Sequence, residues 1–334
     1  MISVSIIIPC KNEEKYIEKC IKSFLNQDYK GVIKIYVVDG LSNDNTINII
    51  KSFGSKVNLI VNEKQTTPYA LNLGLKKSKE DVKIIFGAHA VAYPDFVLKC
   101  VQTIQENEKA FCVGGIIEQV CNDSRSESIS IAMSSSFGVG NAYFRTGQKK
   151  GYVDTVAFGA YKKEVFEKIG YFDENLTRNQ DDEFNFRMTK HGLKIYLSPE
   201  IRSKYFVRSS FIKLYKQYFQ YGFWKVIVNL KYSRVTSLRQ LVPPVFVLFV
   251  LTAWIPGVWI VLAFYIYISI VGLYFITAVT TAFIKGKLRQ IPTIILAFLC
   301  LHWSYGIGYL YALLLWPLKK NKLKNVQAIN SSSR

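Results

Sequence analysis

Residues 241–284 contain no charged side chain, and this run constrains the fold of the chain more than any other feature. A helix needs about 20 residues to cross the hydrocarbon core of a bilayer. The run is long enough for two such helices, and Pro256-Gly257 near its middle predicts the break between them. A third apolar segment follows at about residues 291–316. We therefore expect a membrane domain over residues 236–318 with about three hydrophobic segments.

Basic residues flank the third segment on both sides. Lys285, Lys287 and Arg289 precede it, and a basic polar tail over residues 319–334 follows it, with lysines at 319, 320, 322 and 324. With a cytoplasmic N-terminus and three crossings, the loop obeys the positive-inside rule and the tail breaks it. Either the rule is broken once, or one segment is re-entrant. The third segment, which carries polar residues and glycines, is the weakest candidate for a crossing.

Apolar strands and helical segments alternate in the N-terminal part of the chain. The expected strands are Ser3–Pro9, Lys34–Asp39, Val57–Val61 and Val82–Phe86, each followed by a helical pattern. This alternation predicts an α/β domain over residues 1–205, with a mostly parallel, Rossmann-like sheet and helices on both faces. Ligands of such sheets bind at the C-terminal strand ends. Residues 9–12, 39–44 and 87–90 fall at those ends, so we expect them to converge on one crevice.

Later segments are less regular. Residues 122–151 are rich in Ser and Gly and are interpreted as a loop or lid, and residues 153–161 as a further strand. Residues 209–230 show a helical pattern that mixes aromatic side chains with lysines. This pattern suits an interfacial helix on a membrane over the region 206–235, although an ordinary surface helix fits it nearly as well.

The chain carries a formal net charge of +19, from 43 Lys+Arg against 24 Asp+Glu. Such an excess indicates an anionic partner. The uncharged run favours membrane headgroups and phosphorylated substrates and argues against a nucleic-acid binder. Six cysteines show no metal-binding spacing, which indicates free thiols in a reducing compartment. The apolar run 4–9 is too short for a signal peptide, so we expect a cytoplasmic N-terminal domain.

Three consecutive acids, Asp181, Asp182 and Glu183, stand where a helical pattern begins. Acidic side chains in a first turn complement the free N–H groups there, which is one interpretation. The other is that one carboxylate is a general base that accepts a proton from an attacking hydroxyl. Asn12, Asp39 and Asp44 pose a similar choice, because they could contact a nucleoside or cap turns. The strand ends carry neither G-x-G-x-x-G nor a Walker-type motif, which argues against a dinucleotide or Walker-type site.

The strand-end motifs, residues 81–94 and residues 179–187 together resemble a family 2 glycosyltransferase of the GT-A fold. The resemblance extends to Gly114-Gly115 and to residues 137–140, 153–156, 170–174 and 217–225. It is strongest for the membrane-attached group that includes succinoglycan-biosynthesis glucosyltransferases.

The resemblance implies a nucleoside-diphosphate-sugar donor, such as UDP-glucose, and an inverting single displacement. It places Asp181 as the base with Asp182 as its neighbour, in register with Arg187. The substrate-binding residues carried over from it are Pro9, Asn12, Glu13, Asp39, Asp44, Asn72, Gly87, His89, Gln220 and Trp224.

The family also implies a divalent cation, Mg²⁺ or Mn²⁺, bound near the end of the fourth strand. Here the chain departs from the family, because Gly87 stands where an Asp is usual and His89 where a second acid or His is usual. Mg²⁺ prefers oxygen ligands, so a lone imidazole is a poor replacement. His89 is the remaining candidate metal ligand, and a packed or capping histidine fits equally well.

Processive members of the superfamily carry Gln-x-x-Arg-Trp, and this chain has Phe223 in place of the Arg, between Gln220 and Trp224. This difference weighs against a processive polymer synthase. Trp224 and Tyr221 could stack on an acceptor sugar, but membrane anchoring is the stronger interpretation.

These observations predict a multi-pass membrane enzyme with its catalytic domain on the cytoplasmic face. It would move a hexose to a polyprenyl-diphosphate-linked oligosaccharide in extracellular polysaccharide biosynthesis. Two alternatives remain open at this point: a polyprenyl-phosphate sugar synthase, and a non-catalytic GT-A subunit of a polysaccharide assembly complex.

Overall fold

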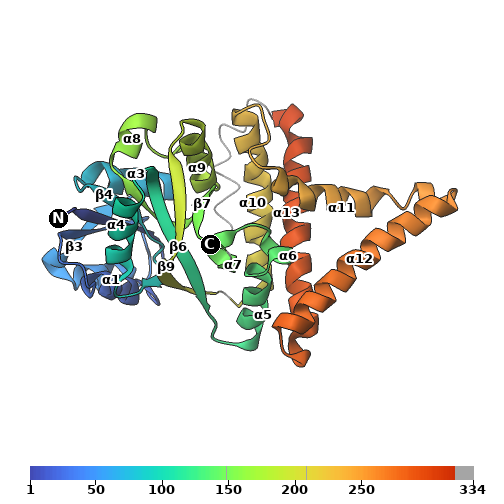
Figure 1. Ribbon diagram of the computed structural model, residues 1–334, viewed down its shortest axis with the longest axis horizontal. Coiled ribbons are helices and arrows are strands. Elements are labelled where there is room, and N and C mark those ends of the chain that lie inside the picture. The colour runs from blue at the N-terminus through green and yellow to red at the C-terminus, as the bar shows by residue number, and fades with distance from the viewer. Residues whose placement is uncertain (148, 208, 320–334) are drawn as a thin grey trace. The chain divides into compact units, whose positions relative to one another are not determined.

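The computed structural model describes residues 1–147, 149–207 and 209–319 (Figure 1). The chain forms two compact units. The α/β unit comprises Met1–Val120 and Tyr143–Phe206, and the helical unit comprises Cys121–Ala142 and the residues from Val207 onward. Cys121–Ala142 belongs with the C-terminal helices, although it lies within the range 1–205 expected for the first domain.

The α/β unit is built on one sheet, with strands in the order β3-β2-β1-β4-β8-β6-β9-β5 and with β7 paired to β9. Its strands are β1 (Val4–Cys10), β2 (Ile33–Asp39), β3 (Val57–Val61), β4 (Val82–Ile85), β5 (Ala90–Ala92), β6 (Ala110–Val120), β7 (Gly151–Val153), β8 (Ala157–Lys162) and β9 (Lys194–Phe206). Its helices are α1 (Ile17–Leu25), α2 (Thr46–Lys51), α3 (Thr67–Lys77), α4 (Phe96–Glu106), α7 (Tyr143–Thr146), α8 (Glu164–Ile169) and α9 (Gln180–Lys190).

The α/β class is confirmed, but the expectation of a mostly parallel sheet holds only for the first strands. β1 pairs in parallel with β2 and β4, and β2 pairs in parallel with β3. β8 runs antiparallel to both β4 and β6, and β5 and β7 run antiparallel to β9. The sheet is therefore mixed. The short β5 and the long β9 were not expected from the sequence.

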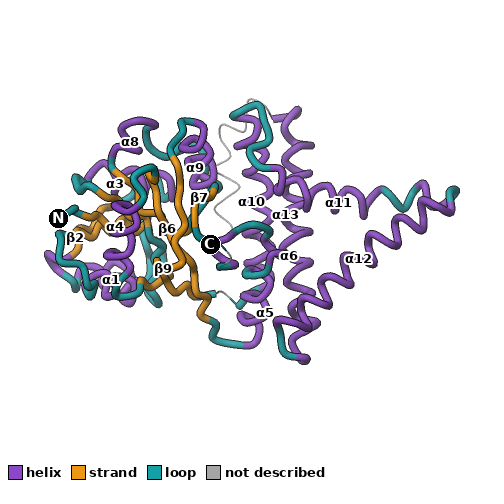
Figure 2. The backbone as a smooth tube through the Cα atoms, viewed as in Figure 1, coloured by secondary structure: helices purple, strands orange, loops and turns teal. Residues whose placement is uncertain are grey.

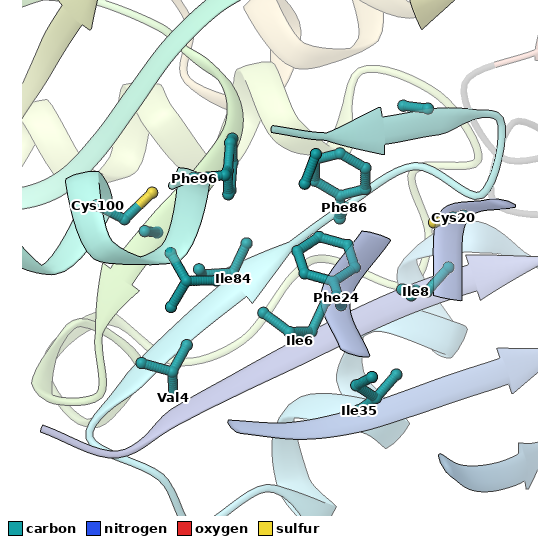
Figure 3. Close-up of a cluster of buried hydrophobic side chains, with 14 of the residues drawn as sticks. Val4, Ile6, Ile8, Cys20, Phe24, Ile35, Ile84, Phe86, Phe96 and Cys100 are labelled. Atoms are coloured by element: carbon teal, nitrogen blue, oxygen red, sulfur yellow. The ribbon is translucent and has the colours of Figure 1, made fainter. Parts of the chain in front are cut away.

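Helices pack on both faces of this sheet, as the alternation of side chains along β1 requires. Ile6 and Ile8 point to the face that α1 and α4 cover, where Phe24 and Phe86 meet edge to face with ring centroids 4.7 Å apart (Figure 3). Ile7 points to the other face and joins a separate cluster with α3, α8 and α9. Phe184 and Met188 of α9 belong to this cluster, so the sheet holds α9 in place.

The helical unit contains α5 (Ser124–Met133), α6 (Ser136–Val139), α10 (Phe211–Lys231), α11 (Val242–Thr252), α12 (Val261–Lys285) and α13 (Ile291–Lys319) (Figure 2). The expectation that residues 122–151 form a loop is wrong for most of the segment. The Asp123 side chain accepts a hydrogen bond from the Ser126 backbone N–H at 2.7 Å and caps α5. Ser126 and Ser128 are fully buried. Serines that suggested a loop therefore cap and pack a helix.

Among the described residues, three helical segments are long and apolar enough to cross a membrane: Leu238–Val258, Val261–Lys285 and Leu288–Trp316. The predicted break at Pro256-Gly257 is confirmed, because a short 3-10 turn, Pro256–Val258, separates the first two. The third contains α13, one continuous helix. Most of the predicted tail, including Lys320, Lys322 and Lys324, lies outside the described residues.

α10 lies against α13, and two glycines allow the close approach. A Cβ atom on Gly222 would lie 2.0 Å from the carbonyl oxygen of Tyr305, and one on Gly308 would lie 2.1 Å from that of Phe219. Glycine at a contact point lets two helix backbones approach closely. Asn229 adds a side-chain hydrogen bond of 3.2 Å to the Tyr309 hydroxyl.

We expect Gly222→Ala to lower the thermal stability of the purified protein, because the new Cβ overlaps a backbone carbonyl that can move only with its helix. Overpacking of this kind costs about 1–3 kcal/mol. Gly272→Ala in α12 is the matched control, because its Cβ would meet nothing within 4 Å. Thermal unfolding in detergent measures both variants. Equal stabilities would show that the α10–α13 contact has room for a methyl group at Gly222.

Candidate active site

The loops that follow β1 and β2 interlock at the same edge of the sheet. Asn12 donates its backbone N–H to the Ser42 hydroxyl at 2.8 Å, and its side-chain Oδ1 accepts from the Asn43 N–H at 2.9 Å. Asn12 has φ +56°, in the left-handed region, which Asn tolerates better than most residues. The predicted convergence of these two loops is confirmed.

Asp44 and Asp39 both act as turn and helix caps. Asp44 accepts from the Thr46 N–H at 3.0 Å and from the Glu14 N–H at 3.3 Å. Partial burial opposes ionisation, but hydrogen bonds from Thr46 and Glu14 hold the pKa of Asp44 below its usual range. Glu13 is fixed through its N–H, 2.8 Å from the Thr46 hydroxyl.

Asp39 is 1% exposed, and its carboxylate accepts from the N–H and the hydroxyl of Ser42 at 2.9 and 2.5 Å. Burial, and then the neighbouring Asp39, raise the pKa of the Cys10 thiol far above its usual range. Pro9 precedes this cysteine in β1 and is half-buried. The geometry therefore favours the capping interpretation of Asp39 and Asp44, and direct nucleotide contacts by Pro9, Asn12, Glu13, Asp39 and Asp44 stay predictions.

The third strand-end segment joins the other two through His89. Its Nδ1 lies 3.3 Å from Glu13 Oε1, and its ring packs edge-on against Tyr205 with centroids 5.0 Å apart. A Cβ atom on Gly87 would lie 3.1 Å from the Phe158 ring. A side chain at position 87 would therefore contact the Phe158 ring tightly. The glycine at this position, where an Asp is usual in the family, fits the close approach of that ring.

The donors near Gly87 do not fit a resident divalent cation. Among the described residues, no group of three or more His, Cys, Asp and Glu side chains converges as metal ligands would. Glu13 and His89 form only a pair, and Gly87 supplies no ligand. Mg²⁺ and Mn²⁺ favour sites richer in oxygen ligands. Among the described residues, the buried Nδ1 of His89 lies near Glu13 but makes no hydrogen bond, and the role of His89 as a metal ligand stays a prediction.

The three acids at the start of α9 lie in three different environments. Asn179 precedes the helix with φ +57°, and α9 begins at Gln180, as predicted. Asp181 is exposed, Asp182 is half-buried and Glu183 is fully buried. Burial raises the pKa of Tyr161 well above its usual range, and the nearby Cys112 and Asp181 act in the same direction. Because Asp181 is the exposed one, it is the acid of the three that solvent and a substrate reach most easily.

Glu183 instead holds Arg187. Arg187 Nε and Nη2 lie 3.2 and 3.0 Å from the two carboxylate oxygens of Glu183. Arg187 also donates to the carbonyl of Tyr171 at 2.8 Å and to that of Ile169. Arg187 therefore fixes the loop before α9 while it is itself held by a carboxylate. The hydrogen bonds from Arg187 to the Ile169 and Tyr171 carbonyls tie α9 to the segment before it, and Glu183 holds Arg187 in place.

Residues 62–66 form a loop that was not predicted to be part of the site. This loop links the strand ends to the segment that precedes α9. The Asn62 N–H donates to the Asp39 carbonyl at 2.7 Å, and Lys11 Nζ donates to Gln65 Oε1 at 2.5 Å. Lys64 Nζ lies 3.6 Å from Glu174 Oε2. The loop follows β3 at the same sheet edge as the others, so the strand-end rule could have identified it.

Asn72 has a structural role in these contacts. It is 3% exposed, donates to the Phe172 carbonyl at 2.9 Å and to Glu174 at 3.0 Å, and accepts from the Phe172 N–H at 3.0 Å. With both ends of its amide engaged inside the protein, Asn72 does not fit the substrate-binding role expected of it. It fixes the segment that leads to α9.

Gln220 and Trp224 belong to the helical unit. Trp224 is only 4% exposed and packs against Phe223. Stacking on a sugar and anchoring in lipid both require an open ring face, so neither interpretation of Trp224 holds in this structure. Gln220 is half-buried on α10, and its contact with a substrate stays a prediction.

The helical unit also contains an apolar cavity of about 370 Å³. Its lining residues are Tyr215, Phe246, Val250, Val271, Tyr274, Phe275, Leu299, Cys300 and Trp303. No charged side chain lines it, so it offers nothing to a nucleoside diphosphate. The groups suited to a donor lie in the α/β unit.

Comparison with known proteins identifies the family of this chain. Residues 5–170 match the model of Glycosyl transferase family 2. Over 231 residues the chain is 38% identical to a Methanococcus voltae dolichyl N-acetyl-α-D-glucosaminyl phosphate 3-β-D-2,3-diacetamido-2,3-dideoxy-β-D-glucuronosyltransferase, covering 66% of this chain and 71% of that protein. It is 26% identical over 248 residues to the succinoglycan biosynthesis protein ExoA of Rhizobium meliloti, covering 71% and 73%.

Solved structures show the same fold. The mannosyltransferase PcManGT from Pyrobaculum calidifontis, solved with GDP-Man and Mn²⁺, matches with a TM-score of 0.57 at 16% identity, over 96% of this chain and 88% of that one. Staphylococcus aureus TarS 1-349, solved with UDP-GlcNAc, matches with a TM-score of 0.51 at 17% identity, over 95% and 92%. The chain belongs to glycosyl transferase family 2, and it is a glycosyltransferase with a GT-A-like fold.

Proposed function

We propose that this glycosyltransferase moves a hexose-type sugar, with inversion, from a nucleoside-diphosphate sugar to a lipid-linked saccharide. The observation that carries the proposal is the different burial of the three acids at the start of α9. One carboxylate, Asp181, is exposed, while Glu183 is consumed by its buried ion pair with Arg187. A single exposed carboxylate on a fixed helix start is what a one-step displacement needs.

In the proposed reaction, an acceptor hydroxyl attacks the anomeric carbon from the side opposite the diphosphate. Asp181 accepts the hydroxyl proton as the new C–O bond forms. The bond from the anomeric carbon to the diphosphate oxygen breaks, and the nucleoside diphosphate leaves with the bonding electrons. The leaving group needs no protonation, so a second acid is unnecessary. Holding Asp181 on a packed helix limits the reorganisation that the transition state requires.

A lipid-linked acceptor is supported by the relatives and by the apolar helices. The Methanococcus voltae relative is named for transfer to a dolichyl phosphate that already carries a sugar, and the ExoA relative for succinoglycan biosynthesis. Three segments of this chain are apolar enough to cross a membrane. The net charge of +19 suits anionic headgroups and the phosphates of donor and acceptor. We therefore place the enzyme in a membrane as a multi-pass protein, with the catalytic unit on the cytoplasmic face.

The name of the first relative favours extension of a lipid-linked saccharide over glycosylation of a bare lipid phosphate. The acceptor would carry a phosphate or diphosphate between its lipid and its first sugar. The product would contribute to a surface or extracellular glycan. UDP-glucose is the donor candidate from the sequence resemblance, and an activated diacetamido uronic acid is the candidate consistent with the name of the Methanococcus relative.

A panel of radiolabelled nucleotide sugars, incubated with membranes that contain the protein and extracted lipid acceptors, tests the proposal. The expected product is a labelled lipid saccharide of at least two sugars, with anomeric configuration opposite to that of the donor. Parallel reactions with Mg²⁺, Mn²⁺ and EDTA measure cation dependence. A single labelled sugar on a lipid phosphate would instead identify a sugar synthase. Nucleotide binding without transfer under any condition would contradict the catalytic proposal.

A further inference from the structure

The three apolar helical segments of the helical unit differ in how much of their surface the protein itself covers. In Leu238–Val258 and Val261–Lys285, only 11% and 6% of the most apolar stretch is buried inside the protein. In Leu288–Trp316 the corresponding share is 39%. In α12 the buried residues are Ala278 and Ala282. Figure 1 shows α10 and α13 side by side, with α11 and α12 forming a hairpin that projects from them. We call this pair of helices the α11–α12 hairpin.

α10, α11, α5 and α6 all contact α13, and the contacts from α5 and α6 include polar groups. At its start, Gln290 Nε2 lies 2.5 Å from Glu127 Oε2 of α5, and the Thr293 hydroxyl lies 2.8 Å from that of Ser128. Further along, His302 Nε2 lies 2.9 Å from the Phe137 carbonyl of α6. Neither α5 nor α6 has the length to cross a membrane. A spanning α13 would carry these polar segments into the hydrocarbon core.

α10 adds the same constraint over the second half of α13. It contacts α13 at Gly222 and Gly308, and it carries four lysines: Lys213, Lys216, Lys225 and Lys231. Lys216 and Lys225 stand more than one turn from either end of α10. Lys225 is buried within the protein, whereas Lys216 is exposed. If α13 crossed the bilayer with α10 alongside, the ammonium group of Lys216 would lie at membrane depth, where charged side chains are costly. The pair is therefore better suited to the interface than to the core.

The α11–α12 hairpin has the opposite character. Its turn, Ala253–Ile260, is uncharged, and Trp254 and Trp259 there are 50% and 78% exposed. Tryptophan is enriched at membrane–water interfaces, which suits a turn that reaches the far headgroups. α12 has 25 residues, enough to cross about 30 Å of hydrocarbon with some tilt. α11 alone has 11 residues, but the apolar segment Leu238–Val258 that contains it has 21, which is also long enough. Its large apolar side chains, such as Leu273 and Ile276, are exposed along its length.

We propose that this chain crosses the membrane only through the α11–α12 hairpin, and that α13 lies with α10 in the headgroup region of the cytoplasmic face. This arrangement resolves the charge conflict found in the sequence. The basic residues before α11, the loop from Lys285 to Arg289 and the lysines from Lys319 onward then share one face, as the positive-inside rule requires. The uncharged hairpin turn is the part that reaches the opposite face.

Single cysteines at four positions, probed in sealed vesicles of both orientations with a membrane-impermeant maleimide, test the proposal. Lys287→Cys lies before α13, Lys322→Cys follows it in the sequence, Val258→Cys marks the hairpin turn, and Lys30→Cys marks the α/β unit. We expect Lys287→Cys, Lys322→Cys and Lys30→Cys to be labelled in inside-out vesicles and protected in right-side-out vesicles. Val258→Cys should show the reverse pattern.

Labelling of Lys322→Cys from the face opposite to Lys287→Cys would mean that α13 crosses, and would overturn the proposal. Labelling of Val258→Cys from the same face as Lys287→Cys would make the hairpin re-entrant and would overturn the two crossings. The unmodified chain in the same vesicles reports labelling of the native cysteines, of which Cys121 and Cys300 are only half-buried. The labelling pattern does not depend on donor or acceptor, so a failed transfer assay would leave this result standing.

Discussion

Asp181→Asn should reduce kcat for sugar transfer by roughly 10²–10⁴-fold, the range that a positioned general base contributes. The amide keeps the size and hydrogen-bonding reach of the carboxylate but cannot accept the acceptor's proton. Asp181 is exposed in the first turn of α9, so the replacement buries no new group and should leave thermal stability nearly unchanged. Initial rates at saturating donor and acceptor measure the loss.

Asp182→Asn is the matched control, because it makes the same chemical change one residue away on the same helical turn. Asp182 is half-buried, and we place it as the neighbour of the base. We expect a smaller loss of kcat for Asp182→Asn than for Asp181→Asn. If Asp181→Asn retained normal transfer, Asp181 would not be the base. If Asp182→Asn lost more activity than Asp181→Asn, the base would move to Asp182. Donor binding by both variants shows that the nucleotide site is intact.

Local patterns in the sequence predicted those parts of the site that are built from contiguous segments. The strand ends at residues 9–12, 39–44 and 87–90 meet because they follow neighbouring strands, and β1, β2 and β4 are indeed parallel neighbours. α9 begins where its acids predict. The break at Pro256-Gly257 also follows from residue type alone, since proline cannot continue the hydrogen bonding of a helix.

Features that depend on distant pairing were not accessible in the same way. β8 inserts antiparallel between β4 and β6, and no local period records that arrangement. The run of acids does not predict which carboxylate is buried. Glu183 is buried and Asp181 exposed because of tertiary packing and the ion pair with Arg187, and these contacts are not visible in the local sequence. Trp224 looked like an interfacial aromatic because the packing of α10 on α13 was unknown. Ser-rich residues 122–151 looked like a loop because capping and packing serines share their composition with turns.

Arg187→Ala should destabilise the α/β unit by about 3–5 kcal/mol, because it leaves the fully buried Glu183 charge without its partner. The substitution also removes the donors to the Ile169 and Tyr171 carbonyls. For a unit of this size, each kcal/mol lowers Tm by about 2–4 °C, so the expected fall is roughly 6–20 °C. Tm of the purified protein, monitored by intrinsic fluorescence, measures the change.

Lys168→Ala is the matched control, because Lys168 and Glu164 form an i,i+4 ion pair of 3.3 Å whose side chains are 51% and 43% exposed. Solvent screens that pair, so its loss should change stability by no more than about 1 kcal/mol. Glu183→Leu combined with Arg187→Met removes both charges and should restore much of the stability lost in Arg187→Ala. It should not restore full transfer if the pair also positions Asp181. Equal Tm values for Arg187→Ala and Lys168→Ala would contradict the assignment of a buried pair, since burial is the main property that separates the two.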